Sequence, residues 1–441
     1  MIRLTGARLL TMDPALGEIE RGWLAVEDGR IAAIGAGDPP AGGPGQSDED
    51  MGGDLVMPGM VNAHAHLPMT LFRGLGEDVD DRLRRYILPL ERALVTAEVV
   101  EVGARLGALE SIRGGVTTIA DMYYHEDRVG AVMDAAGLRG LLGQTLADFA
   151  APDHDGWDEG FARLNALHDA YWDHPRLKTS PAPHAPYSTG LAAMTRVAAW
   201  AEAHPGTRVQ MHLAETRDEI AWARQHHGRT PVELAREAGL LTGRLTAAHV
   251  MYPTEADMDL VAASGAGVAH NARSNGKAGR GIAPVGALRA RGVPVGLGTD
   301  GPMSGNTLDL FAQMAPAAMF QRICAGTRRA MPAAEIVRMA TLGGAEALGM
   351  DSEIGSLAVG KAADLIRIDI SDPRWRPLYD AHAALVYCAL PSDVRATMVG
   401  GRWLMRDRAA ITLDTQKTIA DAEAVAGRFR SHIAPLEAGR A

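Results

Sequence analysis

The middle of the chain alternates short apolar runs with segments of helical periodicity, and this alternation constrains the fold more than any other feature. The runs with the length and composition of buried strands are Met60–His66, Val116–Asp121, Leu138–Gly143, Leu177–Pro183, Arg208–Leu213, Leu245–Val250, Gly267–Asn271 and Val293–Thr299. Strand–helix alternation repeated this often over roughly 250 residues predicts an α/β fold, a (β/α)8 barrel of the TIM type. In such a barrel, the residues that carry chemistry gather at the carboxyl ends of the strands.

Helix-start signals stand between the predicted strands. Thr96 can cap a helix on which Val102, Leu106 and Leu109 share one face. The run Thr230-Pro-Val-Glu233 has the capping-box pattern, with proline at the first helical position. These signals predict helices in the connections that the barrel requires.

The two ends of the chain have a different character, because both contain short β-type runs separated by turn signals such as Asp28-Gly29. Two separated β segments can pair into one small domain. We therefore predict a barrel over residues 57–352, a small β-sandwich domain formed from residues 1–56 and 353–441, and a terminal helix within Thr415–Ile433.

Charge and cysteine content limit the partners. The chain of 441 residues carries a formal net charge of −10, so neither nucleic acid nor an anionic membrane surface is expected to bind it. Only Cys324 and Cys388 are present, which argues against a disulfide framework and for a cytoplasmic location. No window is apolar enough for a signal peptide or a membrane-spanning helix. A small molecule is the expected partner.

The predicted strands end in residues that bind metals or move protons. His64 and His66 close the first strand, and on a strand their side chains point to the same face, about 6–7 Å apart along the backbone. The other such residues are His184 after the fourth strand, His212 in the fifth, His249 in the sixth and Asp300 after the eighth. Alone, a histidine there is more often a structural residue, and an aspartate before glycine is usually a turn former. Their joint placement at one rim predicts a metal site.

Imidazoles with a carboxylate suit a divalent ion, most simply Zn²⁺, although the ligand types leave Fe²⁺ open. Such an ion lowers the pKa of its water from ~15.7 toward ~7 and so supplies hydroxide at neutral pH. Glu215, three residues beyond His212, could deliver a proton to the substrate. Alternatively, Glu215 is only an acidic residue in the first turn of the following helix, where the helix dipole stabilises its negative charge.

Seven stretches in this order resemble a known family: "PGMVNAHAHLPMTLFRGLGED", "PLERAL", "APHAPYS", "MHLAETRDE", "AAHVMYP", "VAHNARSNGKAGRGIAPV" and "LGTDGPMSGNTLDLF". They are similar to the methylthioadenosine/S-adenosylhomocysteine deaminase branch of the amidohydrolase superfamily. Triazine hydrolases and other heterocycle aminohydrolases share much of this pattern. The resemblance therefore specifies the superfamily more sharply than the substrate.

The resemblance implies one divalent metal per chain, commonly zinc, held by His64, His66, His212 and Asp300. It further implies that Asp300 takes a proton from the attacking water, that His249 orients this water, and that Glu215 protonates the purine ring nitrogen. Glu215 and Asp300 would thus also contact the substrate. A homo-oligomer is a further expectation from the family.

The resemblance also implies two substrate contacts, from Glu91 of "PLERAL" to ribose hydroxyls and from His184 of "APHAPYS" to the base. Their presence predicts a hydrolase of C–N bonds in cyclic amidines that deaminates an adenine-type nucleoside: 5′-methylthioadenosine, adenosine or a compound like S-adenosylhomocysteine. Metal-bound hydroxide would attack the ring carbon and ammonia would leave. The alternative is an aminohydrolase or chlorohydrolase of another N-heterocycle, such as a guanine-type base, a pterin or an s-triazine.

Two stretches depart from the family pattern. Members that act on S-adenosylhomocysteine typically carry arginine just after the third strand, where "LLGQTLADFA" has Gln144. This predicts a substrate without a free carboxylate. The loop after the seventh strand reads "NARSNGKAGRG", where relatives often have a more apolar "SNLKLASG", so a different pocket wall is expected.

Two other classes are disfavoured. Binuclear amidohydrolases bridge their ions with a carboxylated lysine at the end of strand four, but Lys178 lies near the beginning of that strand. One metal is therefore expected. A catalytically silent barrel would have no need to keep the metal-binding residues together with Glu215 and Asp300.

Overall fold

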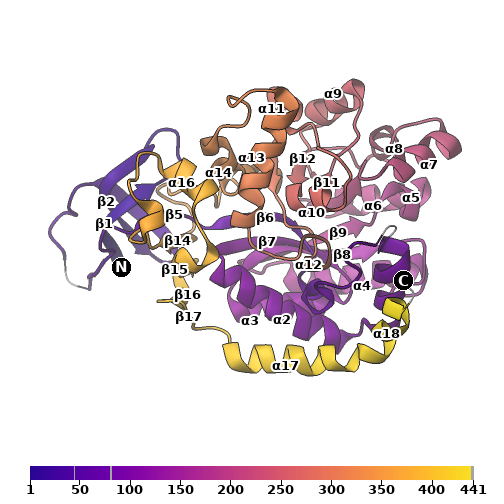
Figure 1. Ribbon diagram of the computed structural model, residues 1–441, viewed down its shortest axis with the longest axis horizontal. Coiled ribbons are helices and arrows are strands. Elements are labelled where there is room, and N and C mark those ends of the chain that lie inside the picture. Colours follow the sequence, from indigo (N-terminus) through magenta and orange to yellow (C-terminus); the bar gives the residue numbers. More distant parts are fainter. Residues whose placement is uncertain (44, 80–81, 439–441) are drawn as a thin grey trace.

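The computed structural model describes residues 1–43, 45–79 and 82–438. Figure 1 shows a large body of strands surrounded by helices, with a smaller β region on one side that contains the N-terminus. The strands of the large body are β6 (Met60–Ala65), β7 (Val116–Tyr123), β8 (Arg139–Leu146), β9 (Leu177–Pro183), β10 (Val209–Leu213), β11 (Leu245–His249), β12 (Gly267–His270) and β13 (Val295–Leu297). Each strand predicted for the barrel is present, and the α/β class is confirmed.

These strands form two parallel four-stranded sheets, in the orders β6-β7-β8-β9 and β10-β11-β12-β13. Backbone contacts link the sheets on both sides. His212 N donates to His184 O at 3.0 Å, between the end of β9 and β10. Ala65 and Asp300 form an isolated parallel bridge, which brings the end of β6 beside the residues that follow β13. The carboxyl ends of the strands in both sheets therefore meet.

Helices fill every connection between these strands. In chain order they are α1 (Leu88–Leu94), α2 (Ala97–Arg113), α3 (Glu126–Ala136), α4 (Gly156–Tyr171), α5 (Pro186–Thr189), α6 (Leu191–Ala203), α7 (Arg217–His227), α8 (Pro231–Glu237), α9 (Glu255–Ser264), α10 (Ala272–Lys277) and α11 (Val285–Ala290). After β13 come α12 (Pro302–Gly305), α13 (Phe311–Ala325), α14 (Ala333–Met339), α15 (Leu342–Ala347) and α16 (Ala381–Tyr387).

Both predicted caps are confirmed. The Thr96 side chain accepts a hydrogen bond from Val99 N at the start of α2, and Thr230 forms a reciprocal capping box with Glu233 at the start of α8. On α2, Val102 and Leu109 are buried, whereas Leu106 is only partly buried. The apolar stripe thus faces the core as predicted, with Leu106 at its margin.

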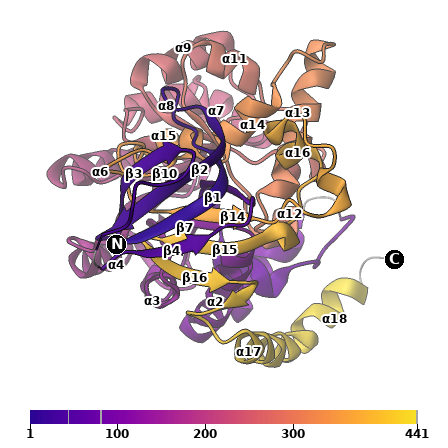
Figure 2. The ribbon, with the colours of Figure 1, turned by 90° about the vertical axis from the view of Figure 1, so that its left-hand side faces the viewer.

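The terminal segments share one nine-stranded sheet, seen face-on in Figure 2. Its strands are β1 (Ile2–Leu10), β2 (Glu18–Glu27), β3 (Arg30–Ala36), β4 (Ser47–Asp50), β5 (Leu55–Pro58), β14 (Leu365–Ile368), β15 (Val394–Val399), β16 (Arg402–Arg406) and β17 (Ala409–Ala410). The two ends of the chain meet where β5 pairs antiparallel with β14. Strand β5 spans the boundary predicted after residue 56.

The predicted terminal helix consists of two helices, α17 (Thr415–Arg428) and α18 (Arg430–Ala438). Figure 1 shows α17 running along one side of the large body, and α18 turning away from its end. Phe429, at the break between them, is buried and stacks on Phe72 with ring centroids 5.4 Å apart. The apolar ring inserts into the core at the point where the helix direction changes.

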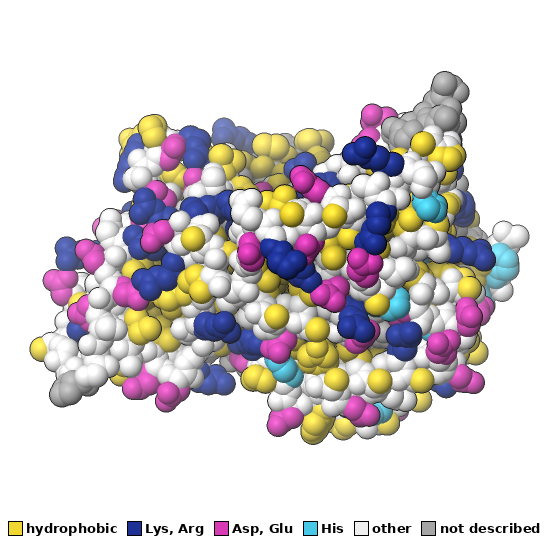
Figure 3. Space-filling view, turned by 90° about the horizontal axis from the view of Figure 1, so that it is seen from below, with side chains coloured by type: hydrophobic (Ala, Val, Ile, Leu, Met, Phe, Trp, Pro, Cys, Tyr) yellow, Lys and Arg dark blue, Asp and Glu magenta, His cyan; other side chains and the backbone are white. Residues whose placement is uncertain are grey.

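The surface carries charges of both signs. On the face seen in Figure 3, basic and acidic side chains are interspersed with apolar ones. Within the described ranges, every helix is too short or too polar to span a membrane.

A buried ion pair joins the large body to the terminal sheet. Arg139, the first residue of β8, donates from Nε to Oδ2 of Asp364 at 2.7 Å, and the two side chains are 4% and 2% exposed. Asp364 also accepts a hydrogen bond from Gly400 N at 2.7 Å. A charge-assisted contact that is this well buried holds the two parts in one orientation.

We expect Arg139→Met to destabilise the fold by about 3–5 kcal/mol, because it leaves the Asp364 carboxylate buried without its cation. The thermal unfolding midpoint measures the loss. Arg21→Met, which breaks the exposed pair between Arg21 and Asp38, is the control and should change the midpoint little. Equal midpoints for the two variants would contradict this role of Arg139.

Candidate active site

A cavity of about 750 Å³ opens at the carboxyl ends of the parallel strands. Its walls contain every residue that the sequence predicted for the site except one. The exception is His64, which is 2% exposed and contacts the rings of His66 and His212. The structure therefore brings all of the predicted site residues to one place.

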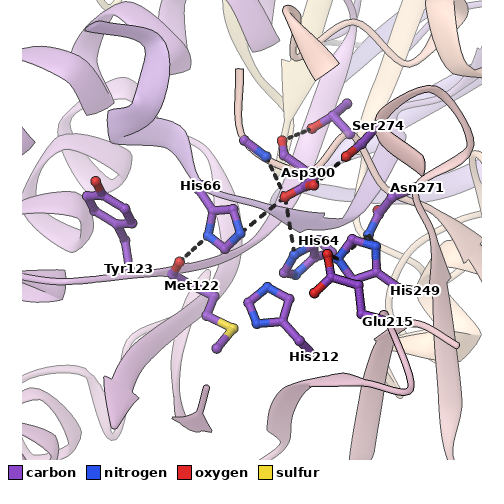
Figure 4. A network of polar contacts seen from close by, with 12 residues as sticks. His64, His66, Met122, Tyr123, His212, Glu215, His249, Asn271, Ser274 and Asp300 are labelled. Atoms are coloured by element: carbon purple, nitrogen blue, oxygen red, sulfur yellow. Dashed lines mark hydrogen bonds and ion pairs between the residues drawn. The ribbon is translucent and has the colours of Figure 1, made fainter. Parts of the chain in front are cut away.

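Three imidazole rings meet at the floor of this cavity (Figure 4). The ring centroid of His64 lies 4.7 Å from that of His66 and 4.9 Å from that of His212. One ligand atom from each of these three residues lies within 4.8 Å of the others, and the same holds for the set of His64, His249 and Asp300. Both sets could hold a metal ion, and they share His64.

Backbone carbonyls fix two of the rings. His66 Nδ1 bonds to the carbonyl oxygen of Met122, and His212 Nδ1 bonds to that of His184 at 2.9 Å. When Nδ1 donates its proton to a carbonyl, Nε2 is left as the lone-pair donor for a metal. The end of β7 thus orients His66, which directly follows β6, and the residue after β9 orients His212 in β10.

Asp300 faces the same space from the segment after β13. Its Oδ1 lies 3.2 Å from Nε2 of His66 and 3.8 Å from Nε2 of His64. Its Oδ2 accepts from Ser274 Oγ at 2.6 Å. Asp300 has a left-handed backbone with φ 61°, which aspartate tolerates better than most residues.

The electrostatics favour a cation among these groups. Burial, followed by the neighbouring imidazoles, lowers the pKa of His64 and of His212 well below the usual value, so both rings are neutral. Burial raises the pKa of Asp300, but the hydrogen bond with His66 and the nearby His249 outweigh it and lower this pKa well below its usual value. The carboxylate is therefore ionised. Burial lowers the pKa of His66, but the hydrogen bond with Asp300 and the charge of that carboxylate outweigh burial and raise this pKa to about 9, so a metal ion would replace the proton on Nε2 of His66. Neutral imidazole and carboxylate are the protonation states in which these side chains bind metals.

One buried atom tests whether a metal fits this site. Among the described residues, Nε2 of His64 is buried and has no hydrogen-bond partner. A buried polar atom without a partner is costly unless something else satisfies it. Three imidazole nitrogens and a carboxylate oxygen form a donor set that suits Zn²⁺, so the residues present fit a divalent ion.

His249 lies at the edge of the imidazole cluster, at the end of β11. Its Nδ1 donates to Oδ1 of Asn275 at 2.9 Å, and its Nε2 lies 3.6 Å from Oε1 of Glu215. The backbone of His249 is left-handed, with φ 76°. Such strained conformations persist where the surroundings over-determine them, and they concentrate at functional sites.

Glu215 follows β10 and is half-buried in the cavity wall. The carboxylate of Glu219 accepts hydrogen bonds from Ala214 N at 3.0 Å and Glu215 N at 2.7 Å, which fixes this turn. Burial raises the pKa of Glu215, but His249 and then Arg280 outweigh burial and lower it to about 2. The side chain is therefore anionic before a substrate arrives.

The predicted substrate contacts lie on other walls of the cavity. Glu91, in α1, accepts a hydrogen bond from Tyr123 OH at 2.8 Å, and burial raises its pKa to about 7. His184 Nδ1 lies 2.6 Å from Ser188 Oγ, and burial lowers its pKa to about 4. A buried carboxyl group that titrates near neutral pH and a neutral imidazole thus face the same space from two directions.

Gln144 lies elsewhere than the sequence indicated. It is inside β8 rather than after the strand, and its Nε2 donates to Oδ2 of Asp153 at 3.1 Å. The cavity is lined by its neighbour Thr145 and by Phe149, and Gln144 is not among the lining residues. Side chains alternate along a strand, so Gln144 is directed into a buried polar contact.

Lys178 is remote from the cavity. It is the second residue of β9, is exposed, and its Nζ lies 3.5 Å from the carbonyl oxygen of Trp172. A lysine at the amino end of the strand cannot bridge ions at the carboxyl end.

Several supporting residues were missed in the sequence. Ser274 and Asn275 lie in the quoted stretch after the seventh strand, at the same rim as the ligands, and this position was an available signal. Glu219 completes the pattern Thr216-Arg-Asp-Glu219, in which Thr216 caps α7 by accepting from Glu219 N at 3.1 Å. Arg280 lies in the same stretch as Ser274, in the loop "NARSNGKAGRG" for which a different pocket wall was expected, and it lines the cavity; its pairing with Glu215 was not predicted.

Comparisons with known proteins agree with this geometry. Residues 55–404 match the amidohydrolase family. A protein of Nitratidesulfovibrio vulgaris named 5-methylthioadenosine/S-adenosylhomocysteine deaminase is 41% identical over 407 residues, which cover 92% of this chain and 91% of the relative. A 5′-deoxyadenosine deaminase of Methanosarcina barkeri is 37% identical over 429 residues, covering 96% and 97%.

Solved structures are similar over nearly the whole chain. An adenosine deaminase from Xanthomonas campestris with bound zinc has a TM-score of 0.94 and 34% identity, and 98% of each chain is covered. A zinc complex of an atrazine chlorohydrolase from Arthrobacter aurescens has a TM-score of 0.89, with 97% of this chain and all of that chain covered; at 22% identity it shows the fold alone. From the family match over residues 55–404 and these relatives, the chain belongs to the amidohydrolase family.

Proposed function

We propose that the protein is a metal-dependent deaminase that hydrolyses the amino group from an adenine-type nucleoside, such as 5′-methylthioadenosine, adenosine or a compound like S-adenosylhomocysteine. The observation that carries this proposal is the meeting of the imidazole–carboxylate cluster with Glu215, His249, Glu91 and His184 at one cavity. The names of the deaminase relatives support the reaction and the substrate class.

His64, His66, His212 and Asp300 would hold one divalent ion, which we propose to be Zn²⁺. A zinc ion lowers the pKa of a bound water to about 7 and so supplies a nucleophile at neutral pH. The zinc-bound adenosine deaminase of similar structure supports this choice of metal.

Two groups would handle the proton of the attacking water. Asp300 is ionised, and its Oδ1 faces the imidazole cluster, so this oxygen can accept a proton. His249 presents Nε2 to the same cavity because Asn275 holds its Nδ1–H. A ring fixed in one tautomer can orient a water molecule by a hydrogen bond of defined direction.

Glu215 would carry a proton to the substrate. Its carboxylate lies 3.6 Å from Nε2 of His249, at the cavity wall, and a ring nitrogen of the base could reach it there. Because Glu215 is anionic before a substrate arrives, it would first take one proton from the attacking water and pass it to this ring nitrogen, which makes the adjacent carbon more electrophilic toward the water oxygen. Asp300 would pass the second water proton to the amino group, so that the C–N bond breaks and ammonia leaves. A positioned acid of this kind typically contributes 10²–10⁴-fold to the rate.

Glu91 and His184 would bind the nucleoside. We propose that Glu91 accepts hydrogen bonds from ribose hydroxyls, with Tyr123 OH fixing its orientation at 2.8 Å. Neutral His184 would hydrogen-bond to the base through Nε2, because Nδ1 is engaged with Ser188 Oγ.

We also propose that the two parallel sheets close into one barrel, supported by the Ala65–Asp300 bridge and the bond from His212 N to His184 O. The division into a barrel over residues 57–352 and a β-sandwich from residues 1–56 and 353–441 remains part of this proposal. A separate apolar cluster, which includes Leu4, Leu24 and Leu365, supports it. The unpaired, exposed Cys324 and Cys388 are compatible with a cytoplasmic location.

Ammonia release tests the substrate class most directly. We expect turnover of 5′-methylthioadenosine or adenosine from a panel that also contains 5′-deoxyadenosine, S-adenosylhomocysteine, guanine, a pterin and an aminotriazine. Chloride release from a chlorotriazine is measured alongside. Exclusive turnover of a compound that is not a purine would overturn the substrate assignment.

Metal removal tests the metal site. We expect one divalent ion per chain, loss of activity with a chelator and recovery when Zn²⁺ is restored. His66→Ala should lose the ion, whereas His432→Ala, at an exposed histidine of α18, should retain it. Two ions per chain, or full activity without metal, would contradict the proposal.

Glu215→Gln tests the proton carrier, because the amide has nearly the same shape and cannot donate a carboxylic proton. We expect kcat to fall by about 10²–10⁴-fold, with the metal content unchanged. Glu202→Gln, at an exposed position of α6, is the matched control. Unchanged turnover in Glu215→Gln would remove this residue from the mechanism.

A further inference from the structure

Arg280 makes a direct ion pair with the carboxylate of Glu215. Its Nη1 donates to Oε1 of Glu215. Both residues line the cavity, and their side chains are 26% and 18% exposed. Among the described residues, Arg280 is the only group that donates a hydrogen bond to this carboxylate.

The position of Arg280 is fixed by its backbone. Arg280 N donates to Asn275 O at 3.1 Å, and Tyr252 OH donates to the carbonyl oxygen of Arg280. Asn275 holds Nδ1 of His249 through its own side chain. The short segment from Asn275 to Arg280 therefore supports both His249 and Glu215, which lie next to each other in Figure 4.

A carboxylate without a partner can rotate about its last side-chain bond, and only some of its orientations point an oxygen toward a substrate nitrogen. A charge-assisted hydrogen bond to one oxygen restricts this rotation. Since Arg280 engages Oε1, Oε2 is the oxygen left for the substrate. We propose that Arg280 is a positioning residue that fixes the Glu215 carboxylate for proton transfer.

This inference rests on the proposed function, because it assumes that Glu215 carries a proton. It differs from a direct role in binding, in which the guanidinium would leave Glu215 and contact an acidic or carbonyl group of the substrate. The two roles make different kinetic predictions: a positioning residue acts through Glu215 and changes kcat, whereas a binding residue changes KM even when Glu215 is altered.

A double-mutant cycle separates these roles. Arg280→Met, Glu215→Gln and the double variant are assayed with the best substrate of the wild-type protein. We expect Arg280→Met to lower kcat roughly ten- to hundredfold and to change KM by less than about threefold. In the Glu215→Gln background the same substitution should cause almost no further loss, because residues that act as a unit are not additive.

Two more variants complete the experiment. Arg280→Lys keeps the charge and should recover part of kcat. Arg229→Met is the matched control, since Arg229 forms an exposed ion pair with Glu237 and neither residue lines the cavity; its kcat should equal that of the wild type. Metal content and thermal midpoints of all variants show whether the site stays intact.

Three outcomes would overturn the positioning role: unchanged kcat in Arg280→Met, an equal loss of kcat in both backgrounds, or a rise in KM in both backgrounds. Failure of the proposed function is seen separately, because the wild type would then not release ammonia from any nucleoside. If another heterocycle is the substrate, the cycle is run with that compound, and the non-additivity still decides the role of Arg280.

Discussion

Three imidazoles and one carboxylate are buried together at the carboxyl ends of parallel strands, and the rest of the site depends on this concentration of metal donors. Burying polar atoms without partners is unfavourable, so the fold must supply either hydrogen-bond donors or a cation. It supplies carbonyl acceptors at the outer nitrogens of His66 and His212. In the part of the chain that the structure describes, the Nε2 atoms of these two rings then have no hydrogen-bond donor facing them, and a divalent ion would stabilise their lone pairs.

The groups that would move protons are held by a different part of the chain. Ser274 binds Asp300, Asn275 binds His249, and Arg280 binds Glu215. Three side chains from strands distant in sequence thus receive one hydrogen-bond partner each from the segment that follows β12. Partners that are themselves fixed by hydrogen bonds keep catalytic side chains close to their productive geometry.

The sequence predicted the metal-binding residues well because strand ends in a parallel α/β fold meet at one rim, whatever the details of packing. Caps such as Thr96 and Thr230 were predictable because they depend on residues three positions apart. The break at Phe429 was not, because the apolar periodicity continues across it, and only packing on Phe72 shows where the helix turns. Pairs such as Arg139 with Asp364 are 225 residues apart, and no local pattern connects them.

Gln144 shows that the direction of a side chain within a single strand is also hard to predict from the sequence. Its position near the end of a strand was predicted nearly correctly, but its side chain binds Asp153, and the cavity is lined by Thr145 instead. A shift of one residue along a strand reverses the face to which a side chain points. Strand ends predicted to within three residues therefore suffice to show which segments reach the cavity. Substrate selectivity, in contrast, depends on the face of the strand to which each side chain points. For this protein, the residues that distinguish substrates are better sought at Thr145, Phe149 and the segment around Arg280 than at Gln144.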